Sequence, residues 1–233
     1  MSFSSRNIVI VGASSGIGEA LFHRLKPEGA HLTTLGRREV ADADRHLDFD
    51  VESEDVVPEL PEVIHGLVYC PGTIFLKPFH RLREEDFLRD WKINFQGAVK
   101  VLQAALPSLK KADGGSVVLF STVAVGTGLG FHASIASAKG AVEGLVRSLA
   151  CEWAPQVRVN AIAPALTETP LAGGLLGSVE KREAAAARHP LKRVGTAEEV
   201  AALTEMLLRD ESASISGQIL RPDGGLSSIR PMV

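Results

Sequence analysis

The chain has 233 residues, a formal net charge of −3 at pH 7 and 45% hydrophobic residues. This charge gives no reason to expect a nucleic-acid partner or attachment to an anionic membrane. The length and apolar content suit one α/β domain that spans residues 1–233. Neither a leader peptide nor an apolar run of membrane length is visible, so we expect a cytoplasmic protein, and we expect no resident metal.

Short apolar runs alternate along the chain with longer patterns of helical period. The runs predict strands over Ile8–Val11, His31–Leu35, His46–Phe49, Gly66–Cys70, Ser116–Ser121, Val157–Ala161 and Gln218–Leu220. The longer patterns predict helices over Ile17–Leu25, Glu84–Lys111, Ser134–Trp153 and Ala197–Arg209. Several runs are continuously apolar, which is typical of strands covered on both faces. The repeated units predict a single doubly wound Rossmann-type domain with a mainly parallel seven-stranded sheet flanked by helices.

Two connections between the predicted strands are short or interrupted. Only about ten residues separate the second strand from the third, which is too few for a crossover helix and its loops. The segment Glu52–Ile64 contains Pro58 and Pro61, so its helix must be brief. Cys70 and Cys151 lie in apolar segments, which predicts buried reduced thiols rather than a disulfide.

A glycine-rich turn follows the first predicted strand and opens the first predicted helix, with the spacing Gly-x3-Gly-x-Gly. Glycines allow a tight turn and bring bare backbone against a pyrophosphate, which the helix N-terminus then attracts. The alternative is a turn that is merely tight. Because a strand precedes it and a helix follows, we favour nucleotide binding by Gly12, Ser14, Ser15, Gly16, Ile17 and Gly18.

The end of the second predicted strand indicates which nucleotide is bound. Arg37 and Arg38 stand where a carboxylate would otherwise contact a ribose 2′-hydroxyl, and guanidinium groups suit a 2′-phosphate. This favours NADP over NAD; the alternative is that both arginines are solvated surface residues. After the third strand, Asp50 and Val51 are candidates to contact the adenine, unless Asp50 caps a following helix.

Five more segments follow the glycine turn along the chain and match the motifs of one protein family in the same order. They are Ile93–Gly97 around Asn94, Gly115–Thr122, Val159–Pro164, Pro190–Val200 and Gly217–Gly225. With the glycine turn, they make the chain resemble the short-chain dehydrogenase/reductase family over essentially its whole length. The resemblance implies an oxidoreductase with a nicotinamide cofactor. It also implies that Gly72, Pro164 and Thr169 lie against that cofactor.

The same resemblance assigns roles to four more positions. Lys139 would hold the nicotinamide ribose and feed a proton relay, unless it is a surface lysine, and Asn94 would seat the relay water. Thr122 stands where the family places a serine and keeps a hydroxyl that polarises the substrate oxygen. Ile135 stands where the family places its tyrosine, and an isoleucine can neither donate nor accept a proton.

The missing tyrosine leaves the proton donor open. His132 precedes Lys139 by seven residues, the separation of tyrosine and lysine in the enoyl-reductase branch of the family, and histidine donates protons near neutral pH. The alternative for His132 is a residue that caps or packs at the helix start. Tyr69, the one tyrosine of the chain, is expected to pack, and Ser134 should point about 100° away from the vacant position.

Two main functions therefore remain open, and non-redox chemistry on the same scaffold, such as dehydration or elimination, is a lesser third. The first is an NADP-dependent oxidoreductase for a small-molecule carbonyl or activated double bond, with His132 or water through the Lys139 relay as donor. The second is an NADP-binding protein without turnover. Residues 171–193, rich in glycine and leucine, should form a substrate lid, and by analogy with the family a homodimer or homotetramer is expected.

Overall fold

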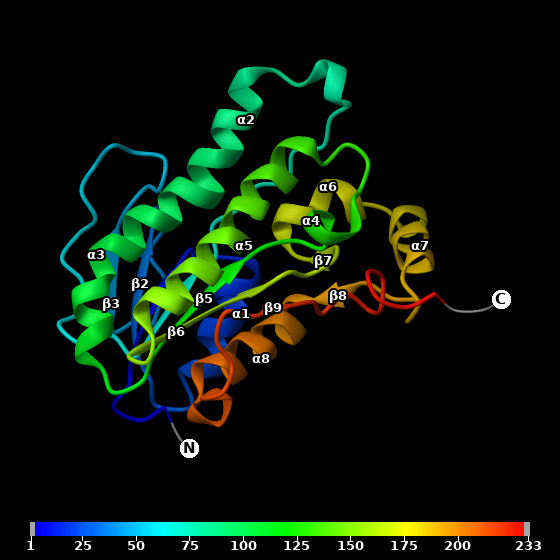
Figure 1. The fold of residues 1–233 in the computed structure, drawn as a ribbon. Coiled ribbons are helices and arrows are strands. Elements are labelled where there is room, and N and C mark those ends of the chain that lie inside the picture. The colour runs from blue at the N-terminus through cyan, green and yellow to red at the C-terminus, as the bar shows by residue number, and fades with distance from the viewer. Residues whose placement is uncertain (1–2, 231–233) are drawn as a thin grey trace.

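The computed structural model, which describes residues 3–230, contains a seven-stranded sheet with the order β3-β2-β1-β4-β5-β6-β9 (Figure 1). Every neighbouring pair of strands in this sheet is parallel, as predicted. The strands are β1 (Asn7–Val11), β2 (His31–Gly36), β3 (Arg45–Asp48), β4 (Gly66–Tyr69), β5 (Gly115–Phe120), β6 (Val157–Ile162) and β9 (Ile219–Leu220). A separate pair joins β7 (Thr167–Glu168) to β8 (Gly195–Thr196).

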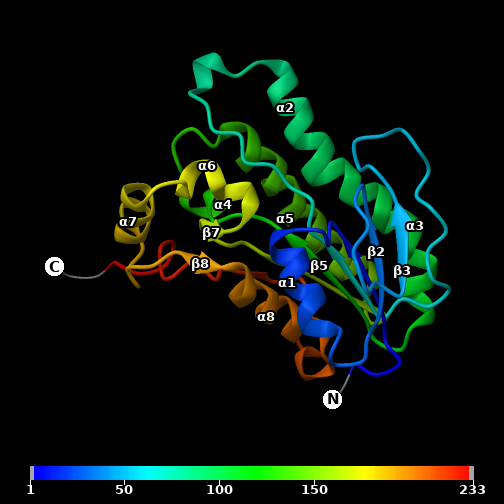
Figure 2. The same ribbon diagram turned by 180° about the vertical axis from the view of Figure 1, so that it is seen from behind.

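Helices cover both faces of the sheet (Figures 1 and 2). One face packs against α1 (Gly16–Leu25) and α8 (Ala197–Leu208), and the other packs against α3 (Gly97–Lys111) and α5 (Ala133–Trp153). Successive side chains of a strand point to opposite faces of the sheet. Ile8 therefore packs in the core under α1 and α8, and its neighbour Val9 packs in the core under α3 and α5. This double burial explains why the strand sequences are continuously apolar.

The strand order reverses beside β1. The chain builds β2 and β3 on one side of β1 and then returns to place β4, β5 and β6 on the other. The carboxyl ends of β1 and β4 therefore diverge into loops that leave in opposite directions. In open parallel sheets, ligands bind in the crevice at such a reversal, and the glycine turn that starts at Gly12 lies there.

Neither of the two connections that the sequence marks as short or interrupted contains a helix. The segment between β2 and β3 has no helix, as predicted. The segment Glu52–Ile64 also has no helix, so the expected brief helix is wrong. Pro58 and Pro61 lack backbone N–H donors and restrict the residues before them, which leaves turns and extended chain.

The long helical pattern between residues 84 and 111 is one continuous rod that changes its hydrogen bonding midway. It consists of α2 (Glu84–Trp91), a π-helical turn (Lys92–Gln96) and α3. The sequence predicts the helix but not the π turn, because the apolar period continues through it. A π turn shifts the backbone ladder by one residue and leaves carbonyls without helical partners.

The predicted lid is mostly helical and has a small core of its own. It contains α6 (Gly173–Leu176) and α7 (Val179–Arg188), which lie beyond the carboxyl ends of the strands (Figure 1). Ala172, Leu176 and Ala185 are buried together there. The remaining helix, α4 (Ala124–Thr127), is a single turn, and 3₁₀ turns occupy Phe79–Arg81, Pro170–Ala172 and Asp210–Ser212.

Within the described residues, no helix is long and apolar enough to cross a membrane. The two cysteines are free thiols, as predicted, and Cys70 is partly buried. Cys151 is exposed, so its predicted burial is wrong. It lies in the last turn of α5, whose core-facing residues there are Ala150 and Trp153.

Candidate cofactor cleft and active site

The glycine turn between β1 and α1 can be built only with glycine at three positions. Gly12 and Gly16 have φ values of +77° and +59°, which favour glycine. A Cβ on Gly18 would overlap the carbonyl oxygen of Gly12. The turn is held to the sheet by a 2.8 Å hydrogen bond from the Gly12 amide to the Leu35 carbonyl. The sequence therefore produces a concave loop of bare backbone at the reversal of the sheet.

The first turn of α1 continues this loop. Ser15 is the N-cap residue in an extended conformation, and its side chain makes no capping hydrogen bond. The amide groups of the first turn are therefore not satisfied by the cap. Together with the helix dipole, such amides attract a phosphate.

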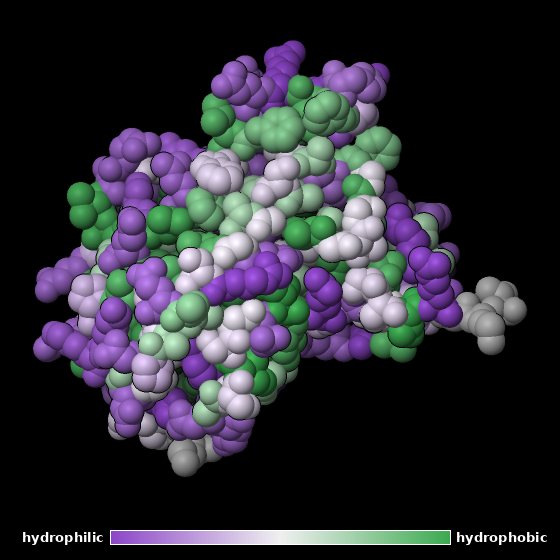
Figure 3. All heavy atoms as spheres, in the orientation of Figure 1, coloured by the Kyte–Doolittle hydropathy of each residue, from purple (hydrophilic) through white to green (hydrophobic). Residues whose placement is uncertain are grey.

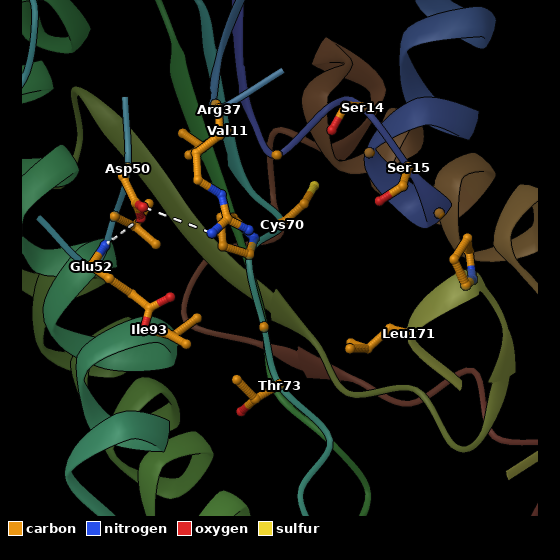
Figure 4. A pocket seen from close by; sticks show the side chains of 18 of the residues that line it. Val11, Ser14, Ser15, Arg37, Asp50, Glu52, Cys70, Thr73, Ile93 and Leu171 are labelled. Atoms are coloured by element: carbon orange, nitrogen blue, oxygen red, sulfur yellow. Dashed lines mark hydrogen bonds and ion pairs between the residues drawn. The ribbon is translucent and has the colours of Figure 1, made fainter. Parts of the chain in front are cut away.

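A cleft of about 520 Å³ opens over this loop (Figure 4). Twelve predicted cofactor residues line it: Gly12, Ser14, Ser15, Gly16, Ile17, Gly18, Arg37, Arg38, Asp50, Val51, Gly72 and Thr169. In Figure 4 the serines of the glycine turn lie on one side of the cleft and the Arg37–Asp50 pair on another. The cleft therefore brings the predicted phosphate loop and the predicted adenosine end into one continuous space.

At the adenosine end, the Arg37 guanidinium lies 3.7 Å from the Asp50 carboxylate, and Arg37 is 69% exposed. Asp50 does not cap a helix, because no helix follows it. Its carboxylate instead accepts a 2.9 Å hydrogen bond from the Glu52 amide, which closes a local turn. The capping alternative is therefore wrong.

A second cavity of about 710 Å³ adjoins the first. The two share part of their lining: Ile17, Cys70, Gly72, Thr73, Ile74, Thr169 and Leu171. The second cavity is walled mainly by apolar side chains, most of which come from the loops after β4 and β5 and from the predicted lid. Four predicted residues line it in addition to those shared: Thr122, His132, Lys139 and Pro164.

Lys139 is the one charged group buried in the wall of the second cavity among the described residues; its exposed fraction is 7%. It makes no hydrogen bond or ion pair with any residue between 3 and 230. Burial lowers the pKa of Lys139 to about 8, while Cys70 and Asp90 act in the opposite direction. The predicted alternative of a surface lysine is therefore wrong.

His132, Ile135 and Lys139 lie along one side of α5 and all face the second cavity. Ile135 is 5% exposed and forms an apolar patch between the other two. His132 is the N-cap residue by position, but its side chain does not cap the helix. Its Nδ1 lies 2.6 Å from the Gly130 carbonyl, so Nδ1 donates there and Nε2 is left for other partners. Thr122 enters from the end of β5, and its hydroxyl accepts a 3.3 Å hydrogen bond from the Ala124 amide.

Two other hydroxyl groups are committed elsewhere. The Tyr69 hydroxyl donates a 2.6 Å hydrogen bond to the Ile93 carbonyl in the π turn, and burial raises the pKa of this phenol. The Ser134 hydroxyl donates a 3.1 Å bond to the Asp86 carbonyl of α2. Neither residue lines the cavity. Tyr69 packs in the core, as expected, and Ser134 is buried against α2 and points away from the cavity that Ile135 faces.

Asn94 lies behind the cavity wall rather than in it. Its amide group donates two 2.8 Å hydrogen bonds, one to the Asp90 carbonyl and one to the Thr73 hydroxyl. Its Oδ1 finds no hydrogen-bond partner within residues 3–230. A Cβ on Gly72 would lie 3.3 Å from this oxygen and 3.7 Å from the Lys139 ammonium, so both groups approach the backbone at Gly72.

Two residues beside Asn94, Thr73 and Asp90, were not predicted as site residues. Thr73 donates a 2.5 Å hydrogen bond to one carboxylate oxygen of Asp90, and Asp90 is only 1% exposed. The sequence did contain a sign of Asp90, because this residue lies one helical turn before Asn94 and therefore on the same buried face.

Within the described chain, no group of His, Cys, Asp and Glu side chains is arranged to hold a metal ion.

The reversal of a parallel sheet, a backbone cradle at that point and a cleft above it define an α/β nucleotide-binding protein. A sequence model of the family described as enoyl-(acyl carrier protein) reductase matches residues 12–227. A tropinone reductase homolog of Arabidopsis thaliana is 34% identical, over 97% of this chain and 94% of its own. The chain belongs to the short-chain dehydrogenase/reductase family and is an oxidoreductase of that family.

Solved structures agree with this assignment. An aldohexose dehydrogenase of Thermoplasma acidophilum, solved without ligand, superposes with a TM-score of 0.89 at 27% identity, covering 99% of this chain and 97% of its own. A putative NAD(P)-dependent gluconate 5-dehydrogenase of Beutenbergia cavernae, solved with bound NADP, superposes with a TM-score of 0.90 at 28% identity. That match covers 97% of this chain and 98% of the other.

Proposed function

We propose that this protein uses NADP(H) to transfer a hydride to or from a small molecule that carries a carbonyl group or an activated double bond. The observation that carries the proposal is the position of Lys139. This buried ammonium faces an apolar cavity that shares its wall with the cleft over the glycine turn. A lysine there binds ribose hydroxyls from the cleft side while the substrate occupies the apolar side.

The preference for NADP is supported by Arg37 and Arg38. Both line the cleft, and the 3.7 Å separation of Arg37 from Asp50 is loose for an ion pair. An exposed pair of this kind holds its arginine weakly, so a 2′-phosphate competes well for the guanidinium. The gluconate 5-dehydrogenase solved with NADP is in keeping with this choice.

The coenzyme supplies the hydride, and the chain must manage the proton. Thr122 offers a hydroxyl to the substrate oxygen, in the place where the family has a serine. Ile135 occupies the place of the family tyrosine, so His132 serves as the acid, or water does so through a relay that ends at Lys139. Because Nδ1 of His132 is bonded to Gly130, the ring releases a proton from Nε2 only in its doubly protonated form.

The substrate is expected to be largely apolar. Leucine, isoleucine, valine and phenylalanine side chains dominate the second cavity, and Leu171 and Leu175 of the predicted lid contribute to it. Such a lining gains free energy mainly from hydrocarbon surface, while a few polar groups orient the reacting carbon. Sugar-like substrates would leave most of their hydroxyl groups without partners there.

We also propose a homo-oligomer built on α2, α3 and α5. Leu88 and Trp91 are 57% and 42% exposed on α2, and Trp91 stacks near Phe95 with ring centroids 4.4 Å apart. Figure 3 shows apolar and neutral side chains along α2 and α5 on this face. Exposed aromatic and leucine side chains on neighbouring helices are typical of subunit contacts.

A second candidate function is coenzyme binding without turnover. It is favoured by one observation: the wall at Ile135 is apolar, and the hydroxyl of the one tyrosine in the chain, Tyr69, is bonded to the Ile93 carbonyl. No phenol is therefore available to the cavity. In this case Lys139 would contribute to coenzyme affinity alone.

The two candidates are separated by mixing the protein with NADPH and a panel of quinones, aldehydes, ketones and enoyl thioesters, followed by absorbance at the reduced-nicotinamide band. Oxidation of NADPH supports the first. Binding without oxidation by any compound supports the second. When turnover is found, His132→Ala should reduce it at least about tenfold, whereas His80→Ala, at an exposed position outside both cavities, should not. Equal rates in the two variants would remove His132 from the mechanism.

A further inference from the structure

Lys139 stands at the centre of a small set of titratable groups. From its own helix, His132 and Glu143 lie seven residues before and four residues after it. From the end of β4 comes Cys70, and from α2 comes Asp90; both act electrostatically on Lys139. A buried ammonium is costly unless an anion compensates it, so the identity of that anion determines whether Lys139 is charged.

Three of these four groups are unsuited to compensate the charge of Lys139. The Glu143 carboxylate accepts a 2.9 Å hydrogen bond from Ser121 and pairs with Arg147 at 3.3 Å. Burial raises the pKa of the Cys70 thiol to about 12, so this thiol is neutral at physiological pH. His132 carries either no charge or a positive one.

Asp90 has the geometry of a counter-charge. It is buried, and the Thr73 hydroxyl fixes one of its carboxylate oxygens while Asn94 bonds to its backbone carbonyl. Its second oxygen, Oδ2, has no hydrogen-bond partner anywhere in residues 3–230. Native proteins rarely leave a buried carboxylate oxygen unpaired, and such a group requires an explanation.

The unpaired atoms gather around one short stretch of backbone. Thr73, which holds Asp90, follows directly on Gly72, where Lys139 and the unpaired Oδ1 of Asn94 both approach. Gly72 and Thr73 line both the cleft and the cavity; Asp90 lines the cleft and Lys139 lines the cavity. The positive charge therefore lies next to Gly72 and the negative charge next to Thr73, without a direct ion pair between them among the described residues.

We propose that Asp90 is the counter-charge that keeps Lys139 an ammonium ion, and is therefore a positioning residue for coenzyme binding in a site without a phenol. This inference rests on the proposed function for its consequence but not for its electrostatics. The ammonium form of Lys139 donates hydrogen bonds to ribose hydroxyls without accepting any in return. Without the negative charge of Asp90, the same lysine would become neutral at lower pH and bind the coenzyme less well.

The test is to titrate Lys139 itself in the full-length protein, using ¹³Cε-labelled lysine and NMR, with Lys139→Met to assign the resonance. Asp90→Asn keeps the shape and removes the charge. We expect the pKa of Lys139 to fall by at least about half a unit, which is a threefold loss of proton affinity. Asp86→Asn is the matched control, one turn earlier on α2 and paired with Lys77, and should leave the Lys139 titration unchanged. Asp90→Glu should restore most of the wild-type value.

A second measurement tests the expected effect on coenzyme binding. The dissociation constant of NADPH should rise between pH 6.5 and 8.5 about threefold more steeply in Asp90→Asn than in wild type or Asp86→Asn. Asp90→Ser, which is smaller and neutral, replaces Asp90→Asn if that variant does not fold. An unchanged Lys139 titration in a folded neutral variant overturns the inference, whatever the enzyme does. A shifted titration together with no affinity for NADPH supports the electrostatics and refutes the proposed function instead.

Discussion

Replacing Lys139 with methionine is expected to stabilise the protein while it weakens coenzyme binding. Lys139 is buried, and burial lowers its pKa from 10.5 to about 8. The folded protein therefore binds this proton less tightly than the unfolded chain does. Methionine is unbranched and apolar and fills nearly the same space without a charge.

The size of the effect follows from the two pKa values. At about 1.4 kcal/mol per pKa unit, the drop from 10.5 to about 8 means that the buried ammonium costs about 3 kcal/mol at neutral pH. Repacking around a side chain of similar volume costs about 1 kcal/mol. We therefore expect a net gain of about 2 kcal/mol, which is about 4–8 °C in Tm for a chain of this length.

The stability gain of Lys139→Met should depend on pH in a definite direction. Because the folded pKa lies below the unfolded one, the cost is fully present below pH 8 and disappears as the pH rises through 10.5. Urea unfolding at pH 7 and at pH 10, with the exposed Lys110→Met as control, measures it. A Lys139→Met variant less stable than wild type at pH 7, or a gain that is unchanged at pH 10, would refute the reasoning.

Three further outcomes are expected. Gly97→Ala should destabilise the protein by about 2 kcal/mol in urea unfolding, because the new Cβ would overlap the Tyr69 hydroxyl and break its bond to the Ile93 carbonyl; a neutral result would show that the π turn relaxes freely. Arg37→Ser should weaken NADPH binding at least about tenfold in fluorescence titration and leave NADH unaffected, and equal losses for both would argue against 2′-phosphate recognition. Ile135→Tyr should add ketone reduction in the NADPH assay, and its absence would mean that the cavity lacks more than a phenol.

The parts of the fold that follow from local sequence could be predicted, and those that depend on distant contacts could not. The strands are visible because their apolar runs are continuous, and the glycine turn is visible because only its spacing allows the backbone to bend. The π turn was missed because it changes which carbonyls are bonded and leaves the apolar period intact. Its stabilising contact, from Tyr69 to Ile93, joins residues that are 24 positions apart.

The same division applies to the candidate site. Lys139 and Ile135 could be identified by their separation on one helix, and both face the cavity. Asp90 could not, because its role depends on Thr73, a residue 17 positions away that approaches it only after β4 and α2 have packed. The one local sign was that Asp90 is an acidic residue on a buried face of its helix, where a residue with no role beyond contact with solvent is not expected.

The pairing of Ile135 with Lys139 constrains what the lysine does. If Lys139 served only the fold, an apolar residue would serve better, since the buried charge costs about 3 kcal/mol of stability. If it served only to lower the pKa of a phenol, it would have nothing to act on beside Ile135. The role left to it is one that an ammonium performs by itself, namely binding ribose hydroxyls or passing on a proton. That role requires the charge to persist at physiological pH, and the unpaired carboxylate oxygen of Asp90, which Thr73 holds in place, is the feature of this structure that would maintain it.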